Sequence, residues 1–302
     1  MRDARFARSV GLRRRRSRDP WAHPRFLAAA TWGYLAWSIV PVLIAVALSF
    51  NSGRSNSTFQ GFGTEWWFGS PQGDPQGSLF TSPDLRGAIV QTLLLSVVTM
   101  LVAVPLGTAF AIGLDRWRGR GARGANLAML ASFVMPEIVM AVAFLYLVQY
   151  VYAFVPLGTV AQVLALVTLQ VSLPFILVRA RLLALGPEYE EAALDLGAPP
   201  RDSLRRVLLP LLAPAILASL ALVFANTVDD FVTVSYLSAG AGTQPLSVKI
   251  YVSVRAAPTP AVNAAATFML VMTTLVIAVG YALYRRVARG QATSVTDFAS
   301  AR

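Results

Sequence analysis

The chain has 302 residues, of which 56% are hydrophobic and only 14% charged, and its mean hydropathy is +0.58. A soluble domain carries about a quarter charged residues, so these proportions exclude a chain that covers itself with a polar surface. The lack of cysteine and the single histidine, His23, exclude disulfides, thiolate chemistry and histidine-cluster metal sites. The composition therefore predicts a membrane protein with no metal or other cofactor.

Six apolar segments are long enough to cross a bilayer, which takes roughly 20 residues. In chain order they comprise residues 26–50, 87–114, 125–148, 157–178, 207–228 and 264–284. Only the third contains a charged residue, Glu137. Prolines inside several segments, Pro136 among them, imply a bundle in which neighbouring helices satisfy the freed carbonyls, and Gly107 with Ala111 permits close helix contact. We expect an all-α integral membrane protein with six transmembrane helices.

The formal charge of +11 could indicate a nucleic-acid partner, but its distribution indicates membrane orientation instead. Of the 26 basic residues, 22 lie before the first segment, after the second, around the loop after the fourth, or at the C-terminal end. The other four lie on or beside the alternate loops, so the positive-inside rule places both termini in the cytoplasm. We expect a basic cytoplasmic tail at 1–25, a transmembrane domain at 26–286, a cytoplasmic tail at 287–302 and no nucleic-acid partner.

The first apolar segment has a competing interpretation as a signal peptide, because it follows a basic start and contains Ala45-Val46-Ala47. Its 25 residues exceed the 7–15 of an ordinary signal-peptide core. We therefore expect an uncleaved first helix. The loop that follows, 51–85, carries the aromatic cluster Trp66-Trp67-Phe68, which either covers a partner protein or settles at the membrane interface.

The loop between the fourth and fifth segments has the pattern of two short helices around a turn. Pro187 suits a first helical turn, and the acidic residues that follow it lie near the positive end of the helix dipole. Gly197 supplies a C-terminal stop, and a second helix can start near Pro200. Asp202 is spaced to pair with Arg205 or Arg206 in that helix. The sequence predicts a compact, exposed helical hairpin of a shape suited to docking.

This hairpin also carries a family resemblance. Glu191-Ala192-Ala193, Gly197, Val207 and Leu209-Pro210 match the EAA motif of bacterial ABC-importer permeases, in which EAA, G, I and LP are separated by three, nine and one residues. Valine in place of isoleucine is the sole change. The resemblance implies that residues 187–210 form the coupling hairpin that inserts into a cleft of a cytoplasmic ATPase. The alternative is an ordinary amphipathic connector.

Residues 35–285 resemble the spermidine/putrescine permease subfamily more closely. The similar stretches are Ser49-Phe50-Asn51-Ser52, the run from Met135 to Ala141, Asp229-Asp230-Phe231-Val232, Gln244-Pro245-Leu246 with Lys249-Ile250-Tyr251, and the run from Pro260 to Ala264. The resemblance implies a type I ABC-importer permease fold in a bacterial inner membrane. It also implies four kinds of partner: a second permease subunit, a dimer of ATP-binding subunits, an extracytoplasmic substrate-binding protein and a polyamine substrate. Because the chain lacks a G-x-x-x-x-G-K-[ST] phosphate loop, we expect ATP hydrolysis in a partner and no enzymatic activity here.

Three carboxylates lie in apolar surroundings: Glu137 in the third segment, and Asp229 and Asp230 after the fifth. A charge near the bilayer centre costs about 2.5–3.5 kcal/mol, and no span contains a basic residue to offset it. A cationic substrate path would explain all three. The alternatives are a protonated Glu137 bonded to a carbonyl freed by Pro136, and an aspartate pair that marks a helix end.

Other functions remain open at this point. A secondary transporter could use intramembrane acids to relay protons, although it would not explain the EAA register. An intramembrane enzyme is disfavoured by the lack of a clustered nucleophile and base. Within the permease hypothesis, the substrate could also be another small amine, an opine or an aminophosphonate.

Overall fold

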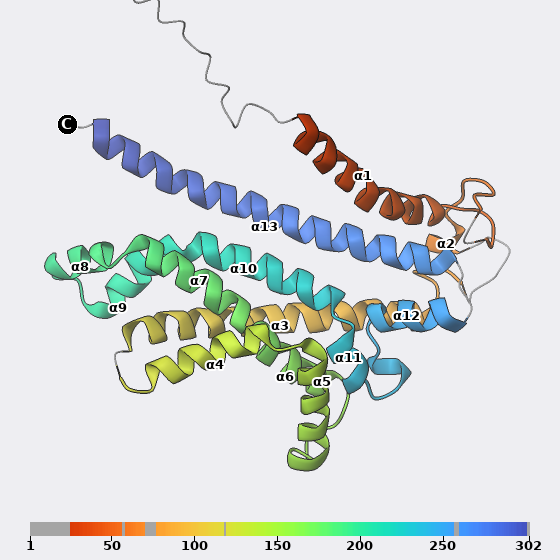
Figure 1. Ribbon diagram of the computed structural model, residues 1–302, viewed down its shortest axis with the longest axis horizontal. Helices are drawn as coiled ribbons and strands as arrows, with labels where there is room; N and C mark the ends of the chain where they lie inside the picture. The colour runs from red at the N-terminus through yellow and green to blue at the C-terminus, as the bar shows by residue number, and fades with distance from the viewer. Residues whose placement is uncertain (1–24, 56–57, 70–76, 118, 257–259, 301–302) are drawn as a thin grey trace, which may run out of the picture. The chain divides into compact units, whose positions relative to one another are not determined.

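The computed structural model describes residues 25–55, 58–69, 77–117, 119–256 and 260–300 (Figure 1). The predicted basic tail at 1–25 therefore lies outside the described residues, apart from Arg25. Contacts divide the chain into two units, Met1–Ala45 and Val46–Arg302. Helix α1 (Arg25–Leu48) contains the first predicted span, with Pro41 inside it. It ends three residues into the second unit.

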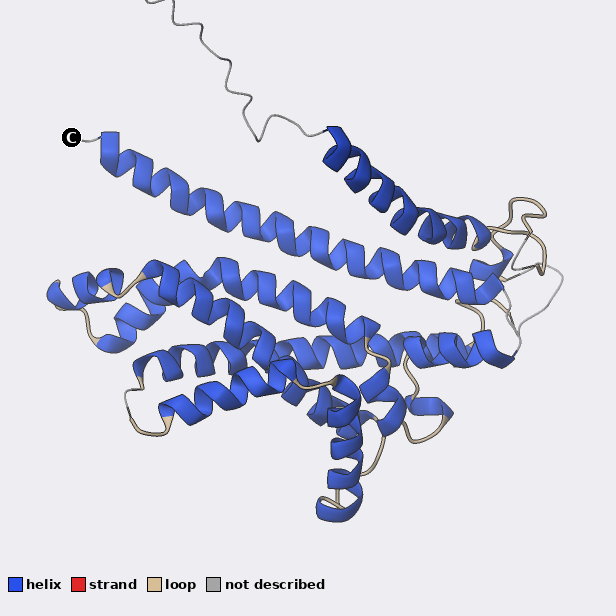
Figure 2. Ribbon diagram, viewed as in Figure 1, coloured by secondary structure: helices blue, strands red, loops and turns tan. Residues whose placement is uncertain are grey.

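All regular elements in the described residues are helical, apart from an isolated bridge between Asn51 and Phe62 (Figure 2). The second unit contains α2 (Glu65–Phe68), α3 (Pro83–Arg116), α4 (Ala122–Val134), α5 (Glu137–Tyr146), η2 (Leu147–Val151), α6 (Thr159–Gln170), α7 (Ser172–Leu185), α8 (Glu188–Asp195), α9 (Pro200–Asp202), η3 (Ser203–Leu208), α10 (Leu209–Asp229), α11 (Val232–Leu237), η4 (Ala241–Thr243), α12 (Leu246–Ala256) and α13 (Pro260–Ser300). Helix α13 continues through most of the segment predicted as a C-terminal tail.

Five stretches of the described chain are long and apolar enough to cross a membrane. They are Phe26–Leu48, Pro83–Arg116, Thr159–Leu185, Pro200–Asp229 and Pro260–Arg286. These correspond to five of the six predicted spans, and the remaining one is broken. The chain bends by 106° between Ala122–Val134 and Glu137–Val151, so the proline expected inside the third span breaks it into two helices.

Proline explains the position of this break. The residue before a proline is pushed out of the helical region, and Met135 has φ −62° and ψ 137°. Pro136 is also extended, with ψ 129°, and α5 begins at the next residue. Glu137 therefore lies at the start of a helix rather than in the middle of one.

The bundle is centred on α3, which packs against α7 and α10, while α10 also packs against α13. Gly107 of α3 lies so close to α7 that an added Cβ would be 2.6 Å from Pro174 Cγ and 2.7 Å from the Val171 carbonyl oxygen. This confirms the predicted close helix contact at Gly107. Beside it, buried apolar side chains of α3, α7, η3 and α10 form one core cluster: Ala111, Phe175, Val178, Leu182, Leu208 and Leu212.

In the second unit, different short helices lie beyond the two ends of α10. Figure 1 shows α8 and α9 beyond one end of α10, and α11 and α12 beyond its other end. A chain that crosses a membrane along α10 therefore places the hairpin on one side and α12 toward the other.

Candidate functional site

A cavity of about 430 Å³ lies where α4, α5, α6, α7, α10 and α11 meet. It is lined by the three carboxylates singled out in the sequence, Glu137, Asp229 and Asp230, and by Phe231. Of the described residues that line it, none is basic. Its other polar lining residues are neutral: Ser132, Gln170, Ser172 and Asn226. We call this the acidic cavity.

Each carboxylate lies at an interruption of a span. Glu137 is the first residue of α5, and Asp229 is the last residue of α10. Asp230 is extended, with φ −59° and ψ 122°, and its Oδ1 accepts a hydrogen bond from the Val234 N–H of α11 at 3.3 Å. The aspartate pair thus does mark a helix end, as one alternative held. Discontinuous helices are also the elements that build substrate and ion sites in membrane transporters.

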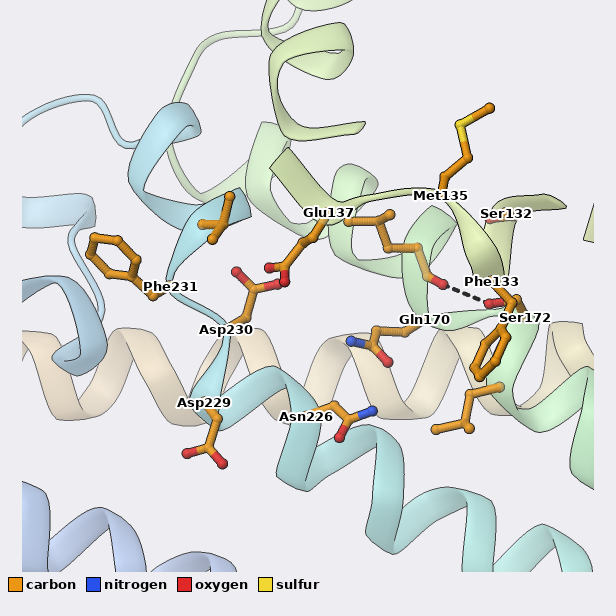
Figure 3. Close-up of a pocket in the computed structure, with 13 residues that line it drawn as sticks. Ser132, Phe133, Met135, Glu137, Gln170, Ser172, Asn226, Asp229, Asp230 and Phe231 are labelled. Atoms are coloured by element: carbon orange, nitrogen blue, oxygen red, sulfur yellow. Dashed lines mark hydrogen bonds between the residues drawn. The ribbon is translucent and has the colours of Figure 1, made fainter. Parts of the chain in front are cut away.

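Glu137 and Asp230 are brought together by the fold, and Asp229 is not brought to them. Figure 3 shows the carboxyl groups of Glu137 and Asp230 facing each other, close enough to interact electrostatically. The Asp229 side chain points away from that pair (Figure 3) and is exposed, whereas Asp230 is only 8% exposed. The Thr233 hydroxyl of α11 donates to Glu137 Oε1 at 3.5 Å.

Three features of the cavity, besides its carboxylates, favour a cation. The C-terminus of α10 opens at Asp229, and a helix C-terminus carries a partial negative charge. The neutral side chains add carbonyl and hydroxyl oxygens that can accept hydrogen bonds from an ammonium group. Phe133 adds an aromatic side chain to the lining, and ring faces attract cations.

A buried amide network holds α11, whose first residue, Val232, lines this cavity. Gln91 Nε2 of α3 donates to Gln162 Oε1 of α6 at 2.9 Å. Gln162 Nε2 lies 3.1 Å from the Val234 carbonyl oxygen and 3.0 Å from that of Thr243. Gln162 is fully buried, so the network fixes α11, which follows Asp230. Sequence reasoning missed both glutamines, although an amide within an apolar span is itself a signal of interhelical bonding.

The second predicted site is the hairpin formed by α8, α9 and η3. Helix α8 begins directly after Pro187 and ends before Gly197, whose φ is +83°. The N–H of Ala198 donates to the Ala193 carbonyl at 3.0 Å, which closes the helix end around the left-handed glycine. The second helix begins at Pro200, as predicted, but it is not short: it continues through η3 and α10 to Asp229.

The hairpin residues of the EAA register differ in exposure. Glu191, Ala192, Gly197 and Pro210 are exposed, and Ala193, Val207 and Leu209 are half-buried. The predicted ion pair is present between Arg206 and Asp202 at 3.7 Å. The structure adds an apolar feature, since Leu196 is 90% exposed at the tip. Residues 203–208 form a π-helix, which the sequence reasoning did not foresee.

Broken apolar spans around a polar cavity, joined to an exposed helical hairpin at one end, define a membrane transport permease. The chain belongs to the family of binding-protein-dependent transport system inner membrane components, whose sequence model matches residues 84–292. It is therefore a multi-pass inner-membrane protein of the ABC-importer permease type. Such permeases act beside an ATP-binding subunit and a binding protein.

Individual relatives cover most of the chain. It is 31% identical to the spermidine/putrescine transport system permease protein PotC of Escherichia coli over 257 residues, which cover 84% of this chain and 92% of PotC. It is 30% identical to the putrescine transport system permease protein PotI of Escherichia coli over 290 residues, covering 94% and 97%. It is also 30% identical over 221 residues to the molybdenum transport system permease protein ModB of Mycobacterium bovis, covering 67% and 81%. These relatives are transport subunits rather than enzymes.

Solved structures share the fold. A bacterial ABC transporter that imports alginate superposes with a TM-score of 0.66 at 17% identity, covering 87% of this chain and 96% of the other. The inward-facing MetNI methionine ABC transporter gives a TM-score of 0.58 at 19% identity, covering 67% and 95%. The predicted type I importer fold is therefore confirmed.

Proposed function

We propose that this permease conducts small aliphatic polyamines, putrescine or spermidine, through the acidic cavity. The observation that carries the proposal is the cavity lining, with three carboxylates and, among the described lining residues, no basic side chain to neutralise them. Family membership leaves the substrate open, since one relative belongs to a molybdenum transport system. The sign of the charge in the cavity points to the substrates named for PotC and PotI.

The electrostatics favour several positive charges on one substrate. An ammonium about 4 Å from a carboxylate gains about 4 kcal/mol at an effective dielectric of 20. Glu137 and Asp230 face each other, so one ammonium between them interacts with both carboxyl groups (Figure 3). Asp229 points elsewhere on the lining and offers a separate position for a second ammonium. Opines and aminophosphonates carry anionic groups that these carboxylates repel, which ranks them below polyamines and other simple amines.

The hairpin supports the second part of the proposal, a coupling role. We assign Glu191, Ala192, Ala193, Gly197, Val207, Leu209 and Pro210 to the docking segment for an ATP-binding subunit. Its tip presents small residues and the exposed Leu196 beside acidic side chains. The working assembly is this chain, a second permease subunit, two ATP-binding subunits and an extracytoplasmic binding protein. Closure of the ATP-binding subunits would move the hairpin and, through α7 and α10, the walls of the cavity.

Uptake by the assembled importer in proteoliposomes tests the path. Glu137→Gln and Asp230→Asn remove charge while they keep shape and hydrogen-bonding capacity. We expect at least one of them to lower spermidine uptake about tenfold, which corresponds to about 1.4 kcal/mol in the barrier. Asp115→Asn is the matched control, because Asp115 is an exposed acid at the end of α3 outside the cavity. Wild-type uptake of spermidine and putrescine by the Glu137→Gln/Asp230→Asn double variant would show that the acids are structural.

A further inference from the structure

One face of α12 carries a row of side chains that leads to the acidic cavity. Ser247, Tyr251 and Arg255 are spaced four residues apart, so they lie on the same helix face. The Ser247 hydroxyl donates to the backbone carbonyl of Asp230 at 2.8 Å. The Tyr251 ring lies 4.6 Å from the ring of Phe231, measured between centroids. Both contacts attach α12 to the segment that holds Asp230.

The outermost member of the row is a cation on an aromatic face. The guanidinium carbon of Arg255 lies 4.6 Å from the centroid of the Tyr251 ring, well inside the range of a cation–π contact. Tyr251 is 41% exposed and Arg255 is exposed, so the contact is open to solvent. In the described part of the chain, Arg255 forms no ion pair with a carboxylate. The guanidinium is therefore held weakly and can be exchanged for another cation.

We infer that the face of Tyr251 is an outer binding subsite for an alkylammonium group, and that Arg255 occupies it in the absence of substrate. The ring of Phe231 contacts Tyr251, and Phe231 directly follows Asp230 and is itself one of the residues that line the acidic cavity. A substrate ammonium that displaces Arg255 from Tyr251 is thus one aromatic ring away from the cavity of Glu137 and Asp230.

The position of α12 in the fold fits an entrance. Helix α12 lies beyond the end of α10 that is remote from the hairpin (Figure 1), so it faces the side opposite the ATP-binding subunits. A substrate released by a binding protein on that side meets Tyr251 before it meets the buried Asp230. The inference rests on the proposed polyamine path, to which it adds a first contact.

Thiol chemistry tests the subsite without relying on transport. The chain has no cysteine of its own, so Arg255→Cys can be assembled with cysteine-free partner subunits and treated with matched methanethiosulfonates. One reagent carries a trimethylammonium group and the other a sulfonate group. Val252→Cys is the control, because Val252 is an exposed residue of α12 outside the row. The ratio of cationic to anionic reaction rates should be about threefold higher at position 255 than at position 252, as expected for a modest cation–π contact.

The role of the Tyr251 ring is tested by combining Arg255→Cys with two substitutions at Tyr251. Tyr251→Phe keeps an aromatic ring, so position 255 should still react faster with the cationic reagent, relative to the anionic one, than position 252 does. Tyr251→Leu removes the ring and should abolish this difference. Saturating spermidine should slow the cationic reagent at position 255 and leave position 252 unchanged. Equal ratios at the two positions, an excess that survives Tyr251→Leu, or a reaction that spermidine does not slow would each overturn the inference. Failure of the polyamine path itself would appear separately, as unchanged uptake by the Glu137→Gln/Asp230→Asn variant.

Discussion

Arg116, the last residue of α3, forms an ion pair with Glu190 of α8, with Arg116 Nη2 and Glu190 Oε1 2.5 Å apart. In the described residues, this pair is the ionic link between the hairpin and the helix at the centre of the bundle. Helix α3 also carries Gln91, which holds α6 and, through it, the α11 wall of the acidic cavity. Under the proposed coupling role, α3 would pass movement of the hairpin to the cavity in addition to α7 and α10.

Loss of this ion pair should weaken coupling more than stability. Both side chains are partly exposed, and such pairs contribute about 0.2–1 kcal/mol. We expect Arg116→Gln to leave the thermal midpoint of the purified importer nearly unchanged. It should lower the number of substrate molecules moved per ATP by up to about fivefold, the equivalent of 1 kcal/mol. The Arg116→Gln/Glu190→Gln double variant should be no worse than the single one, and additive losses would rule out a direct link.

The end of α8 gives a second prediction, on the conformation of Gly197. Its φ of +83° suits glycine, and no atom lies within 4 Å of an added Cβ, so a substitution acts on the backbone and not through a clash. Gly197→Val should destabilise the turn by about 1–2 kcal/mol and reduce ATPase stimulation by the binding protein. Gly197→Asn is the control, since asparagine tolerates this conformation. Equal activity of the valine and asparagine variants would contradict a role for the turn geometry.

The buried amide network predicts a stability effect at Gln162. Leucine at this position fills a similar volume but removes the bonds from Gln162 to Gln91 and to the Thr243 carbonyl, which loses its side-chain donor. An unsatisfied buried polar group costs about 1–3 kcal/mol, so Gln162→Leu should lower the thermal midpoint clearly. Gln149→Leu, at an exposed position, is the control and should change little. The Gln91→Leu/Gln162→Leu variant should lose less than the sum of the single changes, and strict additivity would argue against the network.

Helix packing gives a prediction with a control in the same helix. Gly107 of α3 has Pro174 of α7 and the carbonyl of Val171, the residue before α7, within 3 Å of an added Cβ, whereas Gly113 has no atom within 4 Å. Gly107→Ala should therefore push α3 and α7 apart and cost about 1–3 kcal/mol through overpacking. Gly113→Ala should be neutral or stabilising by up to about 1 kcal/mol, because alanine is the better helix former. The two variants are compared by the yield of folded protein in size-exclusion chromatography and by the thermal midpoint. Equal yields and midpoints for Gly107→Ala and Gly113→Ala would refute the close contact between α3 and α7 at Gly107.

The features that the sequence predicted well depend on neighbouring residues. The second and fifth predicted spans, 87–114 and 207–228, agree with α3 (Pro83–Arg116) and α10 (Leu209–Asp229) to within a few residues. Transfer of a residue into the bilayer depends mainly on its own side chain, so the length of an apolar run is sufficient for this prediction. The hairpin was predictable for a similar reason, since helix starts and stops are set by residues such as Pro187 and Gly197 within one turn of the end.

Other features were decided only by the tertiary structure. Pro136 was visible in the sequence as a possible kink, but the 106° bend depends on how α4 and α5 pack against their neighbours. Gln91 and Gln162 are 71 residues apart and meet because α3 packs against α6.

The acidic cavity shows the same division. The sequence by itself determined that three carboxylates lie in apolar surroundings without a basic residue in any span to offset them. It could not determine that Glu137 and Asp230 face each other while Asp229 points away (Figure 3). Charge and hydropathy are properties of each residue. The two carboxyl groups meet only because the start of α5 and the end of α10, which are far apart in the sequence, are packed next to each other. That coincidence is a consequence of packing, and packing is fixed only when the whole bundle has formed.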